Sequence, residues 1–486
     1  MSMAPPVKPD SGATPLAAPT DTPAAGIAPI FAAQKAGAEA RRRDFGHAAR
    51  RAALIGLREG LARHEGALVA ALAADFGKPE IEVVLTELLP VQQEIRHTLR
   101  HLRRWMRPRR VLPDLATFGT QARLRPEPRG TCLIVSPWNY PVSLSFGPLV
   151  SCLAAGNSAI LKPSEMTPAT SAVIARIVAD SFPPELVAVV TGGKETAQAL
   201  LDLPFDHIFF TGSPEVGRIV MAAAARHLGS VTLELGGKSP TIIGPGADLA
   251  QAADWVTFGK FINAGQTCIA PDHLFVHESV RARFTGLLRD RIARAYGAEG
   301  TAPTGMARIV TPGHAERLRG LLDDATAKGA RLISGGPGQG TALPPTLIEA
   351  ITPQMEIDRQ EIFGPILPIL PYTELSEVIA RINAHSKPLA LYVFERDRAF
   401  AERILSETSS GSVGINLTAL QFSHSRLPFG GVNNSGIGAA HGIYGFRAFS
   451  HEKAILRNRF SALPLLFAPY GARARRLVGL ARRVLG

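Results

Sequence analysis

Cysteine is scarce in this chain of 486 residues, which contains Cys132, Cys152 and Cys268 and no others. An odd, sparse set gives no disulfide framework and is typical of a reducing compartment, so we expect a cytoplasmic protein. No pair of these cysteines has the spacing of zinc ligands, and we therefore expect no metal site.

Long hydrophobic runs are missing as well. No apolar stretch reaches the roughly 18 residues that a transmembrane helix needs. The N-terminal segment lacks the basic start and apolar core of a secretory signal. Its composition, rich in Pro, Ala and Thr, predicts a disordered tail over residues 1–30.

Acidic residues are outnumbered, with 41 Asp and Glu against 53 Lys and Arg, which gives a formal net charge of +12. Much of the excess lies in two runs, 96–110 and 473–483. In the first run the arginines lie largely off the apolar helical stripe, so a solvated helix face explains them. No DNA- or RNA-recognition motif accompanies either run, and we expect no nucleic-acid partner.

The fold class follows from the regular alternation of apolar runs and helical patterns. Between residues 131 and 235, five short β-rich runs are separated by helices, which predicts a parallel, doubly wound α/β sheet. A second α/β region follows Gly236, with a helix near 249–263. We expect its strands near residues 274–277, 331–334 and 389–393. Sheets of this kind bind ligands at the carboxyl ends of their strands.

Cys268 is the first candidate for chemistry. It follows a helix and a segment of small and polar residues, Asn263 to Thr267, where a thiol can be partly exposed and nucleophilic. The alternative is a buried, inert thiol, which is our interpretation of Cys132 and Cys152.

Glu234 and Asn139 are the next two candidates, and each follows an apolar strand. Glu234 precedes Gly236, and partial burial there suits a carboxylate to deprotonating water. The alternative is a strand-end carboxylate paired with a lysine. Asn139 offers an uncharged NH2 donor to a developing oxyanion. The alternative is an ordinary turn asparagine.

Two further segments follow strands and suit a dinucleotide. In residues 210–217, a strand-to-helix turn with Gly212, Ser213 and Gly217, the free N–H groups of a helix N-terminus favour a phosphate. The alternative is an ordinary helix cap. Lys162 and Glu165 are suited to ribose hydroxyls, and a carboxylate there favours a free 2′-hydroxyl. The alternative is a solvated charged loop.

Seven segments, taken in order, resemble the aldehyde dehydrogenase superfamily over roughly residues 36–457. They are PWNYP, LKPSE, FTGSPEVG, LELGGKSP, NAGQTCIAPD, EIFGP and LPFGG followed by NSG. Tyr140, residues 270–272 and residues 449–451 resemble the class 3 branch of that family. The C-terminal extension around residues 468–471 is similar to bacterial coniferyl aldehyde dehydrogenases.

The resemblance implies a role for each matching residue. Cys268 is the nucleophile, Asn139 and the backbone N–H of Cys268 hold the oxyanion, and Glu234 activates the water that hydrolyses a thioester. The implied cofactor is NAD, with NADP also accepted. The implied cofactor contacts are Ser136, Pro137, Trp138, Lys162, Glu165, Gly212, Ser213, Gly217, Glu361 and Phe363.

The implied substrate is an aromatic or hydrophobic aldehyde, with coniferyl aldehyde as the specific expectation. Fatty aldehydes and semialdehydes stay open as alternatives, and so does a non-catalytic structural or binding protein on the same fold. Two segments depart from the usual pattern of the family. The segment Val432 to Gly436 has asparagine where a glycine is usual, and we expect residues 416–426 to line the substrate entrance.

The resemblance also implies a domain organisation and a homodimer. We expect an NAD(P)-binding domain (31–117 and 128–235), a catalytic domain (236–446), a β-ribbon oligomerisation element (118–127 and 447–457) and a basic amphipathic tail (458–486). On a helical projection the tail arginines share one face and the apolar residues take the other. Two interpretations remain open, packing against the partner subunit and peripheral contact with an anionic membrane.

Overall fold

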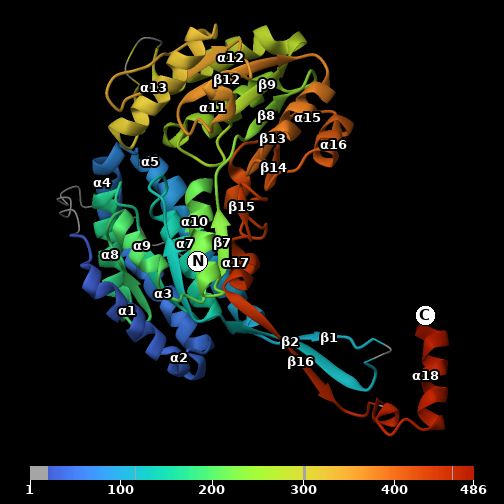
Figure 1. Ribbon diagram of the computed structural model, residues 1–486. Coiled ribbons are helices and arrows are strands. Elements are labelled where there is room, and N and C mark those ends of the chain that lie inside the picture. Colours follow the sequence, from blue (N-terminus) through green and yellow to red (C-terminus); the bar gives the residue numbers. More distant parts are fainter. Residues whose placement is uncertain (1–19, 115–116, 299–300, 302, 462, 486) are drawn as a thin grey trace, which may run out of the picture.

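Two sheets and a long ribbon organise the chain in the computed structural model (Figure 1). The structure describes residues 20–114, 117–298, 301, 303–461 and 463–485. Within these ranges no helix is both long and apolar enough to cross a membrane.

The first sheet has the strand order β15-β7-β6-β3-β4-β5, and the five strands β3 to β7 are parallel. The predicted doubly wound α/β fold is therefore confirmed. The strands are β3 (Thr131–Val135), β4 (Ser158–Lys162), β5 (Val187–Val189), β6 (His207–Thr211) and β7 (Ser230–Glu234). The connecting helices are α7 (Ser143–Ala155), α8 (Pro168–Ser181), α9 (Lys194–Leu201) and α10 (Pro214–Arg226).

Local sequence explains where these helices begin and end. Helix α7 ends at Gly156, whose φ of 97° is left-handed and unfavourable for a residue with a Cβ. Helix α10 begins after Ser213, whose side chain accepts a hydrogen bond from the N–H of Val216, and Pro214 occupies the first turn.

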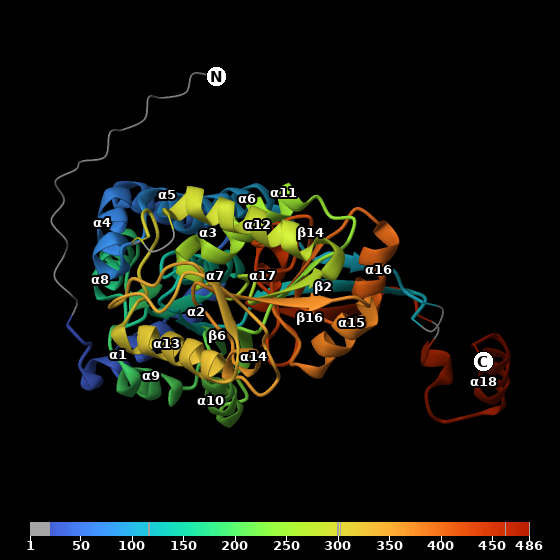
Figure 2. The ribbon, with the colours of Figure 1, turned by 90° about the horizontal axis from the view of Figure 1, so that it is seen from above.

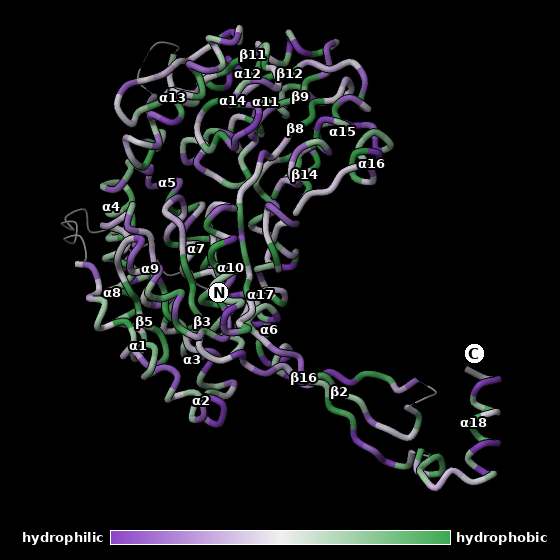
Figure 3. Tube along the Cα trace, in the orientation of Figure 1, coloured by the Kyte–Doolittle hydropathy of each residue, from purple (hydrophilic) through white to green (hydrophobic). Residues whose placement is uncertain are grey.

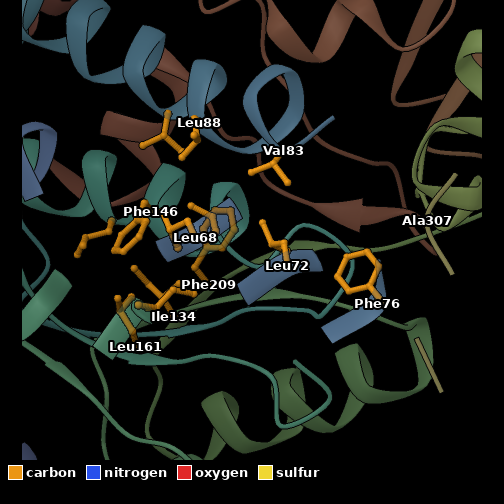
Figure 4. Packing of buried hydrophobic residues seen from close by; sticks show 14 of the residues in the cluster. Leu68, Leu72, Phe76, Val83, Leu88, Ile134, Phe146, Leu161, Phe209 and Ala307 are labelled. Atoms are coloured by element: carbon orange, nitrogen blue, oxygen red, sulfur yellow. The ribbon is translucent and has the colours of Figure 1, made fainter. Parts of the chain in front are cut away.

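Six N-terminal helices lie beside the first sheet, and several of them pack against its helices α7 and α8. A π-helical turn (Val84–Leu88) joins the last two. The helices are α1 (Ala24–Ala36), α2 (Ala38–Asp44), α3 (His47–Arg63), α4 (Glu65–Phe76), α5 (Glu80–Val83) and α6 (Leu89–Trp105). Figure 4 shows leucines of α4 in the same buried cluster as Phe146 of α7 and Phe209 of β6. Each such side chain stabilises the fold by about 1.5–3 kcal/mol through burial.

The disordered tail predicted for residues 1–30 extends too far along the chain, because its last residues form a helix. Residues 1–19 of that segment lie outside the described residues, but α1 begins at Ala24 rather than after residue 30. The helix forms because it has a partner for its apolar face. Ile27 and Phe31 are buried, and the ring of Phe31 meets that of Phe205 edge-on at 4.8 Å.

The second sheet has the order β10-β11-β12-β9-β8-β13-β14, in which every pair except β10 and β11 is parallel. The strands predicted near 274–277, 331–334 and 389–393 are present as β9, β10 and β13. The strands are β8 (Pro240–Ile243), β9 (His273–His277), β10 (Arg331–Ser334), β11 (Thr346–Glu349), β12 (Ile366–Tyr372), β13 (Ala390–Phe394) and β14 (Ser412–Ile415). The helices are α11 (Leu249–Phe261), α12 (Glu278–Tyr296), α13 (Pro312–Ala327), α14 (Glu356–Arg359), α15 (Leu375–Ala384) and α16 (Arg398–Glu407).

The chain then returns to the first sheet earlier than the sequence predicts. Strand β15 (Gly436–Ile437) pairs antiparallel with β7, and helix α17 (Gly442–Ala448) packs against α6 and α7. The last residues of the predicted catalytic segment 236–446 thus lie with the first sheet, where they cover the otherwise free edge of β7. Asn433 has a φ of 57°, so it adopts the left-handed backbone that asparagine tolerates better than most residues.

An arm projects from this two-sheet body (Figures 1 and 2). Strands β2 (Thr120–Pro128) and β16 (Ser450–Asn458) pair antiparallel over their full length, and β1 (Arg109–Val111) lies on the other side of β2. Beyond the ribbon come a short 3-10 turn (Leu463–Leu466) and helix α18 (Ala472–Leu485). Figure 3 shows apolar and polar residues mixed along α18.

Candidate active site

Cys268 follows a tight loop whose backbone is unusual. Asn263 and Ala264 have φ values of 55° and 54°, and both are fully buried. Such conformations persist only where surrounding contacts over-determine them. Here Gln266 supplies those contacts, because its Nε2 donates to the carbonyl of Asn263 (3.0 Å) and its Oε1 accepts from the N–H of Val310 (3.0 Å). The loop leaves Cys268 half-buried at the wall of a cavity.

Asn139 lies against the same loop. Its Nδ2 donates to the carbonyl of Gln266 at 3.0 Å, and the side chain is 4% exposed. In return, Nδ2 of Asn263 donates to the carbonyl of Asn139 at 2.9 Å. An amide group has two N–H donors, and no hydrogen bond of the second one is found among the described residues. The structure thus brings the predicted oxyanion donor to the loop that carries the predicted nucleophile.

Glu234 ends strand β7 and lines the same cavity as Cys268. Its side chain is 4% exposed, and neither carboxylate oxygen has a hydrogen-bond partner among the described residues. Burial raises the pKa of Glu234 well above its usual range. The alternative pairing with Lys238 is wrong, because the Nζ of Lys238 contacts the carboxylate of Asp272 at 2.5 Å instead.

The cavity that Cys268 and Glu234 share has a volume of about 340 Å³ and a mostly apolar wall. Residues 419, 420, 422 and 423 contribute to this wall, which places the segment predicted to line the substrate entrance at the cavity. The exposed side chains of Leu85, Leu89, Phe258 and Leu420 also belong to the lining. An apolar pocket with a few convergent polar groups is the usual form of a small-molecule site.

Burial also affects the pKa of the Cys268 thiol. Burial, together with the nearby carboxyl groups of Glu361 and Glu234, raises the pKa of Cys268 to about 12. The backbone N–H groups of Cys268 and Ile269 act in the opposite direction, because they favour the thiolate. The thiol is therefore largely protonated at neutral pH in this state of the protein.

Glu361 and Phe363 lie where the two sheets meet. A Cβ atom on Gly236 would clash with Oε2 of Glu361, so the close approach of this carboxyl to the end of β7 requires glycine. Burial raises the pKa of Glu361 to about 8. The ring of Phe363 meets that of Trp138 edge-on at 5.4 Å, which connects two predicted cofactor contacts.

Unsatisfied polar atoms mark the carboxyl edge of the first sheet. The hydroxyls of Ser136, after β3, and Thr211, at the end of β6, are buried and have no partner among the described residues, as is true of Glu234. Buried polar groups of this kind need a ligand or water. Their position fits a polar dinucleotide at the strand ends. Thr211 was not predicted, although its place in the same turn as Gly212 offered a signal.

The remaining predicted cofactor residues follow the same edge. Lys162 is 4% exposed, and its Nζ contacts Oε2 of Glu165 at 3.1 Å. Ser213 is exposed and caps α10. Gly217 lets α10 approach the end of β7, since a Cβ there would lie 2.8 Å from Leu235. Pro137 is half-buried between Ser136 and Trp138, and Gly212 precedes the helix.

A buried ion pair that the sequence did not reveal supports the Asn139 loop. Lys78 and Glu87 are both fully buried, with Nζ and Oε1 2.7 Å apart. The Oε2 of Glu87 accepts from the N–H of Val142 (3.1 Å) and Ser143 (2.9 Å), and the Lys78 ammonium lies 4.1 Å from the Tyr140 ring centroid. The pair thus holds the start of α7. The available signal was the presence of charges in an apolar stretch of residues 78–88.

Removing one partner of this pair should destabilise the protein. In Lys78→Met, Glu87 stays buried without its cation, and such breaks typically cost about 3–5 kcal/mol. We expect a clear fall in Tm by scanning calorimetry. The double variant Lys78→Met/Glu87→Gln should regain most of the loss, because glutamine still accepts from both N–H groups. Equal Tm values for the single and double variants would contradict the assignment.

Comparisons with known proteins agree with this geometry. A model of the aldehyde dehydrogenase family matches residues 4–455. The chain is 41% identical over 425 residues to the "Probable coniferyl aldehyde dehydrogenase" of Caulobacter vibrioides, which covers 85% of this chain and 87% of that protein. It is 42% identical over 412 residues to aldehyde dehydrogenase family 3 member B1 of Bos taurus, which covers 84% and 87%.

Among solved structures, the substrate-bound state of Staphylococcus aureus AldH resembles the model with a TM-score of 0.89. The two are 38% identical, and the match covers 93% of this chain and 99% of that chain. The resemblance to the class 3 branch that the motifs indicate is confirmed by these relatives. The chain belongs to the aldehyde dehydrogenase family and is an oxidoreductase that acts on aldehydes.

Proposed function

We propose that this enzyme oxidises an aromatic or hydrophobic aldehyde to its carboxylic acid at Cys268, with NAD as the favoured cofactor. The observation that supports the proposal is the meeting of Cys268 and Glu234 in one mostly apolar cavity, with Asn139 bonded to the loop that carries the thiol. A thiol, a buried carboxyl and a free amide donor are the groups that acyl chemistry through a thioester needs.

Cys268 begins the proposed reaction. Its thiolate attacks the carbonyl carbon, and the charge that develops on the oxygen is met by the free N–H of Asn139 and by the backbone N–H of Cys268. A nicotinamide held at the strand ends would supply the acceptor for the hydride that leaves this carbon. A thioester on Cys268 remains. Removing one donor to such an oxyanion typically costs on the order of 10²-fold or more in rate.

Glu234 completes the proposed reaction by deprotonating a water molecule that attacks the thioester. Its raised pKa makes the carboxylate a stronger base, and its two unpartnered oxygens leave room for that water. Relatives that transfer the acyl group to coenzyme A or phosphate do not need a base at this position, so Glu234 favours hydrolysis. The same set of side chains also disfavours a non-catalytic role on this fold.

For the cofactor, we propose that Lys162 and Glu165 contact the adenosine ribose and that the N-terminus of α10, with Gly212, Ser213 and Gly217, holds the pyrophosphate. The carboxylate of Glu165 would repel a 2′-phosphate, and this repulsion favours NAD over NADP. The remaining proposed contacts, around the nicotinamide end, are Ser136, Pro137, Trp138, Glu361 and Phe363.

For the substrate, we propose a ring-containing aldehyde such as coniferyl aldehyde. Aromatic side chains line the cavity, namely Tyr140, Phe209, Phe258, Phe422 and Phe429. Neither Lys nor Arg is among the described residues that line it, which disfavours the carboxylate of a semialdehyde. The name of the Caulobacter relative agrees with this choice. Fatty aldehydes fit the apolar wall and remain the second candidate.

The decisive experiment combines two variants of the full-length enzyme. Cys268→Ala should abolish aldehyde-dependent NAD reduction. Glu234→Gln should still give a burst of up to one reduced cofactor per subunit, followed by a steady-state rate about 10²- to 10⁴-fold lower, because the thioester is not hydrolysed. Stopped-flow absorbance at 340 nm on the order of milliseconds measures both phases. Cys152→Ala is the matched control and should keep its activity. Full activity in Cys268→Ala would refute the proposal.

The raised pKa of Cys268 predicts a pH dependence for the cofactor-free enzyme. Because only the thiolate reacts, alkylation by iodoacetamide should accelerate about tenfold per pH unit between about pH 7 and 10, with no plateau. Glu234→Gln should react faster at a given pH, because it removes a carboxyl that raises this pKa. Mass spectrometry locates the label, with the fully buried Cys132 and Cys152 as internal references. A plateau below about pH 8 would contradict the prediction.

We also propose that the arm holds a homodimer together. Strand β16 has one neighbour, β2, and eight of its nine residues are exposed, which leaves a backbone edge unpaired. Three apolar residues of the arm are also 61–71% exposed to solvent, namely Leu456, Phe460 and Phe467. A second copy of this chain is the occupant that would cover both features. Membrane contact through α18 is the alternative, because after Glu452 the sequence has eight basic residues and no acidic one.

Leu456→Glu tests the arm. If a partner subunit buries this side chain, the charge should shift the enzyme from dimer to monomer in light scattering, at a cost of a few kcal/mol. Leu228→Glu, at a body position that is 95% exposed, is the matched control and should leave the mass unchanged. Flotation with phosphatidylserine vesicles tests the alternative, which is membrane contact through α18. The membrane alternative would be favoured if the enzyme binds vesicles, if deleting residues 469–486 abolishes this binding, and if Leu456→Glu leaves the mass measured by light scattering unchanged.

A further inference from the structure

One part of the catalytic cavity is polar, and the proposed reaction does not use it. We call Glu94, Ser151 and His441 the polar end. Glu94 lies on α6, Ser151 on α7, and His441 directly precedes α17. These three helices pack against one another, so the polar end is built from rigid elements and not from a surface loop.

Glu94 has an oxygen without a partner. Its side chain is 6% exposed, and its Oε1 accepts a hydrogen bond from the N–H of Gly442 at 2.7 Å. Its Oε2 makes no hydrogen bond within the part of the chain that the structure describes, although Glu94 lines the cavity. Burial raises the pKa of Glu94 to about 7. Because Oε2 is not among the fully buried atoms and Glu94 lines the cavity, this oxygen is open to a hydrogen-bond donor on a ligand.

The neighbours of Glu94 match an uncharged polar group. Burial lowers the pKa of His441 to about 4, so its imidazole is neutral. The ring packs edge-on against that of Phe422 at 4.8 Å. Ser151 is 4% exposed and contributes a hydroxyl. Because no described lining residue is a cation, an anionic group would lack a partner here, whereas a hydroxyl can donate to Glu94.

The spacing along α7 indicates how long the ligand is. The cavity wall includes residues 143, 144, 147, 148 and 151, which form one face of the helix over two turns. The start of this face adjoins the thiol, since Tyr140 bonds Thr267 at 2.6 Å. From Ser143 to Ser151 the helix rises about 12 Å, at 1.5 Å per residue. The carbonyl carbon and the hydroxyl oxygen of a para-hydroxyphenyl ring with a three-carbon aldehyde chain are about 8 Å apart, and a hydrogen bond of about 2.7 Å extends this reach to about 11 Å. An aldehyde of this kind whose carbonyl lies at Cys268 therefore reaches the polar end.

We propose that Glu94 determines specificity by accepting a hydrogen bond from a phenolic hydroxyl at the far end of an aromatic aldehyde. The aromatic wall favours a ring over an alkyl chain, and a phenol is a stronger donor to a carboxylate than an alcohol is. The proposal rests on the proposed function, because it places the carbonyl of the substrate at Cys268. It adds the group that the enzyme recognises at the other end of that substrate.

Matched substrates and the variant Glu94→Gln test the proposal. The amide keeps an oxygen for the N–H of Gly442 but presents NH2 in place of Oε2. The substrates are 4-hydroxycinnamaldehyde, its 4-methoxy counterpart and cinnamaldehyde, assayed at about pH 7.5, where most of the Glu94 carboxyl is ionised and the phenol still keeps most of its proton. The wild-type enzyme should prefer the hydroxyl compound about 10- to 100-fold in kcat/KM, mainly through KM. In Glu94→Gln this preference should fall to near one, because kcat/KM for the hydroxyl compound falls much more than kcat/KM for cinnamaldehyde.

The controls separate recognition from folding and from chemistry. Glu80→Gln makes the same change at an exposed position outside the cavity and should alter no ratio. An ω-hydroxy alkanal compared with its alkanal shows whether an aliphatic hydroxyl is recognised equally, which would overturn the phenolic assignment. A wild-type preference near one, or an equal loss on all substrates in Glu94→Gln, would overturn the role of Glu94.

A binding measurement distinguishes this failure from failure of the proposed function. Calorimetry with the product acid, 4-hydroxycinnamate, and with its methoxy counterpart reports on Glu94 without turnover. We expect tighter binding of the hydroxyl acid by the wild-type enzyme and equal binding of both acids by Glu94→Gln. If no aldehyde is oxidised but this difference persists, the proposed reaction fails while the recognition by Glu94 stands.

Discussion

The hydrogen bond from the Asn139 side chain to the carbonyl of Gln266 is the contact on which the site depends. Asn139 follows a strand of the first sheet, whereas Gln266 belongs to a loop of the second, so this bond joins the two halves of the site. The reciprocal bond from Asn263 to Asn139 makes the junction double. These two bonds add to those of the Gln266 side chain in keeping the left-handed residues of the cysteine loop in a sparsely populated conformation.

Two buried ion pairs lie on either side of this junction. Lys78 and Glu87 hold the start of α7 from one side, and Lys238 and Asp272 hold the segment of Glu361 from the other, with Asp272 accepting from the N–H of Ile362 at 2.9 Å. Each of these ions has a partner. The Glu234 carboxyl, in contrast, has no hydrogen-bond partner among the described residues. This difference indicates that Glu234 interacts with a ligand or a water molecule, whereas the paired charges have a structural role.

Sequence patterns predict the parts of this arrangement that depend on local chemistry. The strands of the first sheet carry continuous apolar runs, and Cys268, Glu234 and Asn139 follow such runs or helix ends, so their place at the carboxyl edge could be predicted. Lys78 could not be found in this way, because its burial depends on Glu87 and on the ring of Tyr140. The edge strand β15 has two residues and no pattern of its own, and α1 forms because Phe205 lies far away in sequence but adjacent in space.

The state of the Cys268 thiol bears on how such an enzyme survives its own substrates. An unsaturated aldehyde is electrophilic at its β-carbon as well as at its carbonyl carbon, and addition of the thiolate to the β-carbon would inactivate the enzyme. Oxidants also react with the thiolate form. Cys132 and Cys152 are sealed inside the protein, which leaves one thiol at risk. Because burial and two acidic side chains raise the pKa of that thiol, only a small fraction of it is the reactive thiolate at neutral pH, and this protects it from stray electrophiles.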